Sequence, residues 1–225
     1  MIEVKELIKS YSIDGQIFKA VDGVSFTISK GDMVSIVGHS GSGKTTLLSL
    51  LGGLTKPDSG SIVIGSENIL SMTDNILSEF RNRKISFIYQ FSSLIPTLTV
   101  LENVILPTVF RSQRQNVASH ALELLSIVGL QNKINAYPSQ LSGGQQRRVA
   151  IARAFVNDPE LILADEPTGD LDEETEAEMM QFFSSMNRDK GLTFLVVTHN
   201  TELAKKIGRQ LRMQNGVLQE VIGNS

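Results

Sequence analysis

Short apolar runs separated by turn residues indicate an α/β chain. Runs of β-branched and aromatic residues with few polar interruptions are typical of strands buried on both faces of a sheet. Such runs occupy residues 33–37, 85–89, 161–164 and 193–197. Shorter strands are predicted at 2–7, 24–28 and 61–64, and Asn215-Gly216 predicts a closing hairpin with strands at 209–213 and 217–221.

Apolar residues at three-to-four spacing predict helices between these strands. The spacing covers residues 44–51, 75–83 and 173–187, and a further helix opens at Leu141–Gln145 and runs to Val156. Residues 91–140 contain helical patterns only, and Gly129 ends one of them. We therefore predict one domain over 1–225, with an all-helical insert at about 91–157.

The stretch 91–101 is apolar, interrupted by proline and poor in charge. Its residues suit ordinary core packing, and the alternative is a groove that receives another protein. The pattern leaves both interpretations open.

Composition limits the classes of function. The chain has 225 residues, a formal net charge of −3 and no cysteine. The charge and the lack of like-charge blocks argue against a nucleic-acid surface, and the missing cysteine excludes a thiolate metal site. No apolar run reaches the ~18 residues needed to span a bilayer. We expect a soluble, cytosolic chain without direct membrane insertion, whose membrane role would need a partner.

The segment Gly38–Thr45 matches the phosphate-loop pattern between a strand and a helix. Glycines allow backbone N–H groups to approach phosphate closely, and the helix amino end adds partial positive charge. Lys44 can reach the β- and γ-phosphates, and the Thr45 hydroxyl can ligate Mg²⁺. The segment predicts a nucleoside triphosphate site.

A second candidate anion site lies at Leu141–Gln145. Ser142 is the expected N-cap of the helix, and Gly143 and Gly144 leave backbone N–H groups bare at its positive end. The sequence alone does not show whether this site and the phosphate loop meet within one chain.

Polar residues follow the ends of several predicted strands, where ligands meet a parallel sheet. Asp165 can hold a Mg²⁺ hydration shell and Glu166 can take a proton from water, or the two can form a solvated pair. Gln90 ends another strand. His199 is either structural or a γ-phosphate contact, and Tyr11 either packs at an edge or stacks on a base.

Together these motifs resemble the ATP-binding subunit of ABC transporters. Leu141–Gln145 reads LSGGQ, the family signature, and Leu161–Asp165 with Glu166 is similar to the Walker B strand and its following glutamate. Gln90, Thr168–Asp172 and His199 are similar to the Q-loop, D-loop and switch histidine. The implied fold is α/β, a P-loop NTPase core with a parallel sheet, an N-terminal antiparallel β lobe and an all-helical, signature-bearing insert.

The resemblance implies an ATPase that uses ATP and Mg²⁺. The implied catalytic residues are Glu166, His199, Lys44 and Gln90, and the implied metal ligands are Thr45, Gln90 and Asp165. The implied nucleotide contacts are Tyr11, Gly38, His39, Ser40, Gly41, Ser42, Gly43, Lys44, Thr45, Thr46, Ser142, Gly143, Gly144, Gln145 and Asp172.

The resemblance also implies partners. Two copies form a homodimer around ATP, head to tail, and an integral membrane permease docks near residues 91–101. The chain then lies at the cytoplasmic face of the membrane. Residues 91–104 and 164–172 look like the lipoprotein-release and macrolide-export branch. Asn200 departs from the acid usual after the switch histidine, and Gly208-Arg209 departs from Asp-Arg.

Three other functions compete with this interpretation. A soluble ABC ATPase acting on a protein scaffold shares every nucleotide motif. A chromosome or DNA-repair ATPase would need a long coiled coil, and sustained heptads are missing. A GTPase would need Asn-Lys-x-Asp, whereas Asn132-Lys133 continues as Ile134-Asn135.

Overall fold

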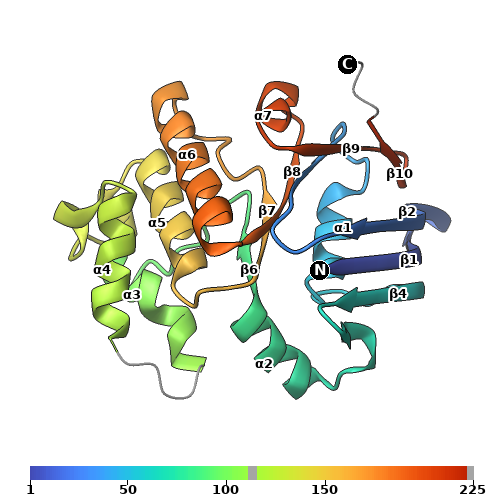
Figure 1. Cartoon of the computed structure of the whole chain (residues 1–225), viewed down its shortest axis with the longest axis horizontal. Helices are drawn as coiled ribbons and strands as arrows, with labels where there is room; N and C mark the ends of the chain where they lie inside the picture. The colour runs from blue at the N-terminus through green and yellow to red at the C-terminus, as the bar shows by residue number, and fades with distance from the viewer. Residues whose placement is uncertain (111–115, 222–225) are drawn as a thin grey trace. The chain divides into compact units, whose positions relative to one another are not determined.

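A computed structural model describes residues 1–110 and 116–221 of the chain. Its backbone forms two compact units (Figure 1). The first, here the sheet unit, comprises Met1–Leu77 and Leu192–Ser225, and the second, the helical unit, comprises Ser78–Gly191. The prediction of a single domain with an insert at 91–157 stays a prediction.

An antiparallel sheet forms the amino-terminal part of the sheet unit, as predicted. Its strands follow the order β2-β1-β4-β5, and β1 pairs with β2 from Ile2↔Ile28 to Ile13↔Gln16. The strands are β1 (Ile2–Ile13), β2 (Gln16–Ile28), β4 (Ser59–Ile64) and β5 (Glu67–Asn68).

The first hairpin is longer than the predicted strands at 2–7 and 24–28. Register shifts interrupt the β1–β2 pairing between Val4 and Leu7, between Leu7 and Lys9, and between Lys9 and Ser10. Each shift breaks the alternation of apolar and polar positions on which the prediction depended. Pairing with β2 nevertheless continues to Ile13.

Parallel strands form the second sheet region of the sheet unit. Strand β3 lies between β8 and β9 and pairs in parallel with both, and β10 pairs antiparallel with β9. Every residue of β8 is buried, as are the last four of β3. The bounds are β3 (Met33–Val37), β8 (Thr193–Thr198), β9 (Arg209–Gln214) and β10 (Val217–Glu220).

Short helices accompany these strands. Helix α1 packs against β8 and β2, and α7 packs against β3 and β8. Helix α2 contains the boundary between the two units. The bounds are α1 (Lys44–Leu51), η1 (Ile69–Ser71), α2 (Asp74–Lys84) and α7 (Thr201–Lys205).

The helical unit combines two parallel strands with a helical bundle. Strands β6 and β7 pair from Ile85↔Leu161 to Ile88↔Ala164. Helix α3 packs against α4 and α5. The bounds are β6 (Ile85–Ile88), α3 (Val100–Ile105), η2 (Leu106–Phe110), α4 (Val117–Ile127), η3 (Gln131–Lys133), η4 (Pro138–Gln140), α5 (Gly143–Phe155), β7 (Leu161–Asp165) and α6 (Glu173–Lys190).

Side-chain caps begin three of these helices. Thr99 caps α3 and Ser142 caps α5, each with a reciprocal capping box, and Asp172 caps α6. Such caps satisfy the backbone N–H groups that a helix start leaves bare. The predicted N-cap role of Ser142 is therefore confirmed.

An aromatic cluster joins α5 to α6, which lie side by side in Figure 1. The ring centroids of Phe155 and Phe182 are 4.7 Å apart, and those of Phe155 and Phe183 are 6.1 Å apart. Phe155 and Phe183 are both almost fully buried. The cluster therefore fixes α6 against the helix that begins with the signature residues.

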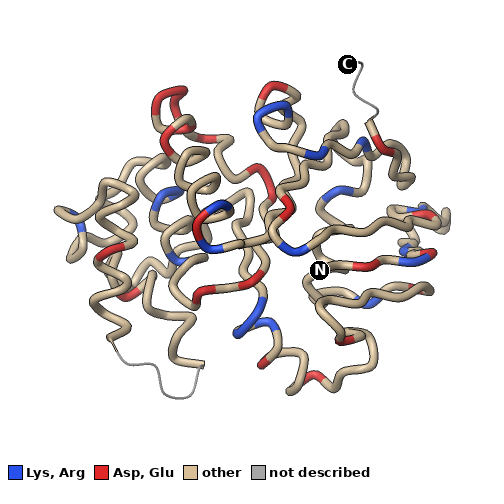
Figure 2. The backbone as a smooth tube through the Cα atoms, viewed as in Figure 1, with Lys and Arg blue, Asp and Glu red and all other residues tan. Residues whose placement is uncertain are grey.

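Acidic and basic residues are scattered along the backbone of each unit (Figure 2). In the described part of the chain, we find no helix with the length and apolar character needed to cross a bilayer.

Phe183→Ala should lower the free energy of unfolding by about 3–5 kcal/mol, because it leaves a cavity in the aromatic cluster. Urea unfolding followed by circular dichroism measures the change. Ile127 on α4 is 53% exposed and serves as the control. Ile127→Ala should cost no more than about 0.5 kcal/mol, and equal losses in the two variants would contradict the assigned core.

Candidate functional site

The phosphate loop joins β3 to α1 in the sheet unit. Its lysine folds back over the loop: Lys44 Nζ donates to the carbonyl oxygens of Gly38 at 2.7 Å and His39 at 3.0 Å. The side chain is buried, with 8% exposure. The loop's own backbone therefore places a positive charge in its centre.

Two loop positions require glycine for steric reasons. A Cβ added to Gly43, whose φ is +106°, would lie 2.0 Å from the Ala20 carbonyl oxygen. A Cβ added to Gly38 would lie 2.3 Å from the Met213 carbonyl oxygen. Because both neighbours are backbone atoms, neither can move away cheaply. The loop is thus held tightly between β2 and β9.

The start of α1 fits an anion. It has no side-chain cap and no acidic residue in its first turn. The buried Ser42 Oγ also has no hydrogen-bond partner among the described atoms. Uncapped N–H groups at a helix start carry partial positive charge, which suits a phosphate group.

Strand pairing places His199 at the same sheet edge as the phosphate loop. Val37 pairs with Thr198, so the chain leaves β3 and β8 at neighbouring points, and His199 is exposed there. Asn200, the departure from the family pattern, accepts hydrogen bonds from the N–H groups of Glu202 at 3.0 Å and Leu203 at 3.1 Å. It therefore caps α7.

Tyr11 lies within β1, beyond the end of the strand predicted at 2–7. It pairs with Phe18 across the hairpin, and the residue is 41% exposed. Lys9 Nζ lies 5.6 Å from the ring centroid. An exposed ring suits the predicted stacking on a base better than edge packing, although its role stays a prediction.

The acidic residues Asp165 and Glu166 lie in the helical unit, together with Gln90. Ile88 pairs with Ala164, so Gln90 and Asp165 leave β6 and β7 side by side. Asp165 is 9% exposed and Gln90 is exposed. Glu166 has a φ of +47°, in the left-handed region. A non-glycine residue in that region costs about 1–3 kcal/mol, and such strain concentrates at functional sites.

Arg147 is a feature that the sequence analysis missed. Its guanidinium donates to the carbonyl oxygens of Tyr89 and Glu166. The side chain is 1% exposed, although it belongs to a helix whose pattern gives no sign of a buried cation. Only the tertiary arrangement reveals this connection.

The signature residues form the open start of α5. Ser142 Oγ accepts from the Gln145 N–H at 3.3 Å, and Gln145 Oε1 accepts from the Ser142 N–H at 3.0 Å. A Cβ added to Gly143 would meet no other described atom within 4 Å, and one added to Gly144 would meet its nearest at 3.5 Å. No contact within the described chain explains why positions 143 and 144 are both glycine.

Asp172 has a structural role whether or not it contacts nucleotide. Its carboxylate accepts from the Thr175 N–H and the Thr175 hydroxyl, both at 2.9 Å. Hydrogen bonds from Thr175 lower the pKa of Asp172 below its ordinary value. The residue caps α6 as a carboxylate.

Each unit contains oxygen donors of the kind that Mg²⁺ prefers. Thr45, Gln90 and Asp165 offer oxygen ligands, which Mg²⁺ prefers. Across residues 1–110 and 116–221, no group of three or more His, Cys, Asp or Glu side chains gathers into a metal cage. Sparse protein ligation of this kind is usual where phosphates complete the coordination.

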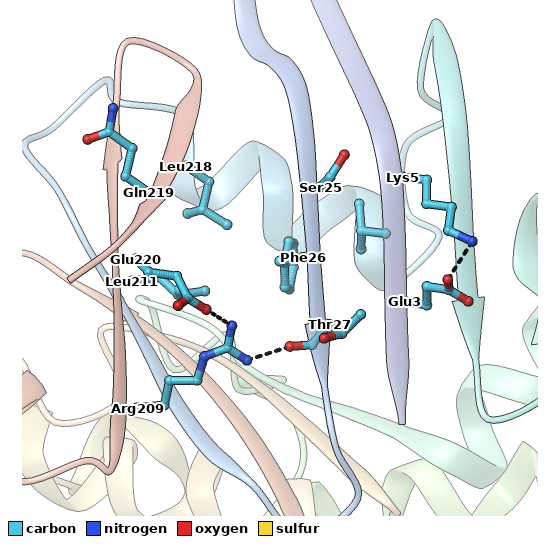
Figure 3. A pocket seen from close by; sticks show the side chains of 11 residues that line it. Glu3, Lys5, Ser25, Phe26, Thr27, Arg209, Leu211, Leu218, Gln219 and Glu220 are labelled. Atoms are coloured by element: carbon cyan, nitrogen blue, oxygen red, sulfur yellow. Dashed lines mark hydrogen bonds and ion pairs between the residues drawn. The ribbon is translucent and has the colours of Figure 1, made fainter. Parts of the chain in front are cut away.

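A pocket in the sheet unit lies apart from these motifs. It has a volume of about 460 Å³, and Arg209 lies in it, donating to the Thr27 carbonyl oxygen at 2.6 Å and contacting Glu220 (Figure 3). Its lining includes none of the predicted site residues. Arg209, which follows the departure at Gly208, thus ties β9 to β2 and β10.

Comparisons with known proteins agree on one family. A family model described as ABC transporter matches residues 21–169. The lipoprotein-releasing system ATP-binding protein LolD from Geobacter metallireducens is 42% identical over 217 residues, covering 96% of this chain and 96% of that protein.

Two solved structures show the same fold. One is a dimeric post-hydrolysis state of the ATP-binding cassette MJ0796 bound to ADP and Pi, with 39% identity and a TM-score of 0.93. The other is dimeric MJ0796, a bacterial ABC transporter cassette, with 40% identity and a TM-score of 0.93. Each comparison covers 99% of this chain and 100% of the other. The predicted fold class is confirmed.

Gly43→Ala should raise the Kd for ATP at least about tenfold, a loss of roughly 1.4 kcal/mol, because the new Cβ displaces the loop. Titration with a fluorescent ATP analogue measures it. Gly15 is the control, since its φ of +77° is also left-handed but its Cβ position is open. Gly15→Ala should lose about 1 kcal/mol of stability, because a Cβ is unfavourable in the left-handed region, and keep its affinity; the reverse order of affinities would refute the loop assignment.

Proposed function

Because this chain belongs to the ABC transporter family, we propose that it is the ATP-binding and hydrolysing subunit of a membrane transporter. Its predicted class of enzyme, an ATPase, is confirmed by that membership. The proposal extends to residue roles, to the dimer and to the membrane partner.

In the proposed binding step, the phosphate loop holds the triphosphate of ATP. The N–H groups at the start of α1 and the Lys44 ammonium offset the phosphate charge, and Tyr11 stacks on the adenine. Thr45, Gln90 and Asp165 would hold Mg²⁺, directly or through water. The ion would supply further positive charge beside the phosphate oxygens.

In the proposed hydrolysis step, Glu166 accepts a proton from water as the water oxygen bonds to the γ-phosphorus. The bond between that phosphorus and the bridging oxygen breaks, and ADP leaves with the electron pair. His199 and Gln90 contact the γ-phosphate and orient the water. Lys44 stabilises the charge that develops on the phosphate oxygens.

The open start of α5 is the observation that carries the dimer proposal. Gly143 has free space where a side chain would fit, although neither its φ nor its neighbours require glycine. We attribute that space to the γ-phosphate of an ATP held by a second copy. Ser142 and Gly144 then bind phosphate across a head-to-tail dimer. The likeness to the dimeric MJ0796 cassettes supports this arrangement.

The segment 91–101 supports a docked membrane partner. Phe91 is 76% exposed and Ile95 is 40% exposed, so much of this apolar stretch is not core. Buried Asn103 holds it in shape: its amide donates to the carbonyl oxygens of Ile95, Leu98 and Thr99 at 2.9–3.1 Å. An apolar surface on a fixed backbone suits a helix from a permease.

We propose lipoprotein release as the transport process, on the strength of the likeness to LolD. Peptide or macrolide export is the neighbouring possibility within the same branch. The chain would lie at the cytoplasmic face of the membrane, held there by its partner. The alternative is an ABC ATPase acting on a soluble protein scaffold, and the protein that copurifies with this chain discriminates between the two.

Glu166→Gln should form a dimer in the presence of ATP and Mg²⁺, because removing the base stops hydrolysis while the bridging charge remains. Gel filtration with and without ATP measures the mass. Adding Lys44→Ala to the same chain should abolish the shift, because the variant no longer binds the triphosphate. A Glu166→Gln chain that stays monomeric with ATP would refute the proposed dimer.

Phe91→Ser should weaken capture of a membrane protein by the tagged chain, because it removes the most exposed apolar side chain of the docking segment. Membrane extracts analysed by mass spectrometry give the recovery, which we expect to fall at least about tenfold, or about 1.4 kcal/mol. Ile127→Ser, on α4, is the control and should keep recovery. Equal recovery by both variants argues against docking at 91–101.

A further inference from the structure

A buried guanidinium links the signature helix to two other segments of the proposed site. Arg147 lies on α5, five positions after Ser142, and is 1% exposed. It donates through Nη1 to the Tyr89 carbonyl oxygen and through Nη2 to the Glu166 carbonyl oxygen. Its fork therefore joins the end of β6 to the end of β7.

Each carbonyl belongs to a peptide group next to a proposed site residue. The Tyr89 carbonyl lies in the peptide bond to Gln90, and the Glu166 carbonyl lies one bond from the Cα that carries the proposed base. Glu166 also has a left-handed φ of +47°, which its neighbours must maintain. The Gly169 N–H donates to the same Glu166 oxygen at 3.2 Å. Arg147 is a charged donor to that oxygen.

The surroundings of Arg147 make it energetically unfavourable for the guanidinium to move out of its position. Burial lowers the pKa of the Arg147 guanidinium, and the carboxylates of Asp170, Asp165 and Glu166 raise it. Arginine keeps its proton at any working pH, so the guanidinium remains a buried cation. A buried cation holds its hydrogen-bond acceptors firmly, since releasing one leaves charge unsatisfied.

We propose that Arg147 is a positioning residue for ATP hydrolysis, which ties the peptide groups of Gln90 and Glu166 to the signature helix. The proposal rests on the function proposed above for Glu166. Arg147 touches no reacting atom in it. It acts by holding the Glu166 backbone in the orientation from which the carboxylate reaches water. A change in the position of α5 is thereby transmitted to the base and to Gln90 together.

The shape of the side chain explains why arginine is needed. A planar fork can donate to two carbonyl oxygens on separate segments at once, whereas an ammonium is a single point of charge. Arg147→Lys should therefore retain part of the function, and Arg147→Gln should retain less.

The main experiment measures ATP binding and turnover for Arg147→Gln and Arg147→Lys in the full chain. For Arg147→Gln we expect kcat to fall at least about tenfold, while the Kd for ATP and the KM change less than about threefold. Arg147→Lys should have an intermediate kcat. A matching rise in KM, or an unchanged kcat, overturns the proposal.

Asn157→Ala is the matched control for lost stability. Asn157 lies just beyond the other end of α5, is 3% exposed, and donates to the carbonyl oxygens of Asn82 and Pro107, both at 3.3 Å. It bridges two backbone segments, but neither carries a proposed site residue. If Asn157→Ala lowers both thermal stability and kcat as much as Arg147→Gln does, Arg147 has only a structural role.

Hydrogen–deuterium exchange tests the positioning separately from the chemistry. Arg147→Gln should speed amide exchange in peptides covering 86–93 and 163–170, and Asn157→Ala should not. Faster exchange together with full activity in Glu166→Gln would show that the assignment of the base is wrong while the positioning stands. Unchanged exchange in both peptides overturns the positioning itself.

Discussion

Parallel pairing between buried apolar strands determines where the polar residues that follow those strands lie in this fold. Strand β3 pairs with β8, and β6 pairs with β7, through residues that are largely inaccessible to water. Since parallel strands run in one direction, their carboxyl ends meet at a common edge. The phosphate loop and His199 follow the paired ends of β3 and β8, and Gln90, Asp165 and Glu166 lie at the paired ends of β6 and β7. Near these strand ends, Lys44 donates to the Gly38 carbonyl oxygen and Arg147 donates to the Tyr89 carbonyl oxygen. Backbone groups therefore fix the positions of both cations.

Local chemistry made the strands, the phosphate loop and the signature predictable. Each depends on residues adjacent in sequence, such as glycine before lysine or serine three positions before glutamine. The long first hairpin was underestimated because bulges spoil its alternation. Arg147 and Asn103 escaped prediction for a different reason: both act on carbonyl groups, which every residue has, so no residue type marks their partners.

The family departures have local explanations. Asn200 replaces an acid and still supplies the oxygen that caps α7. At the pair Gly208-Arg209, the arginine holds β9 to its neighbours, and a Cβ on Gly208 would lie 3.3 Å from the Met33 carbonyl oxygen. Both changes therefore affect the framework near β8 and β9. Neither introduces a new charge beside the phosphate loop.

The phosphate loop also depends on a segment far along the chain. The Gly216 N–H donates to the Ser42 carbonyl oxygen at 3.1 Å, and the Met213 carbonyl oxygen presses on Gly38. The hairpin at Asn215-Gly216 is synthesised long after residue 45. During synthesis, the nascent chain therefore carries a complete phosphate-loop sequence before it has the walls that shape it. Contacts between residues so far apart in sequence slow folding, and the walls of the loop are complete only once the last hairpin has been synthesised.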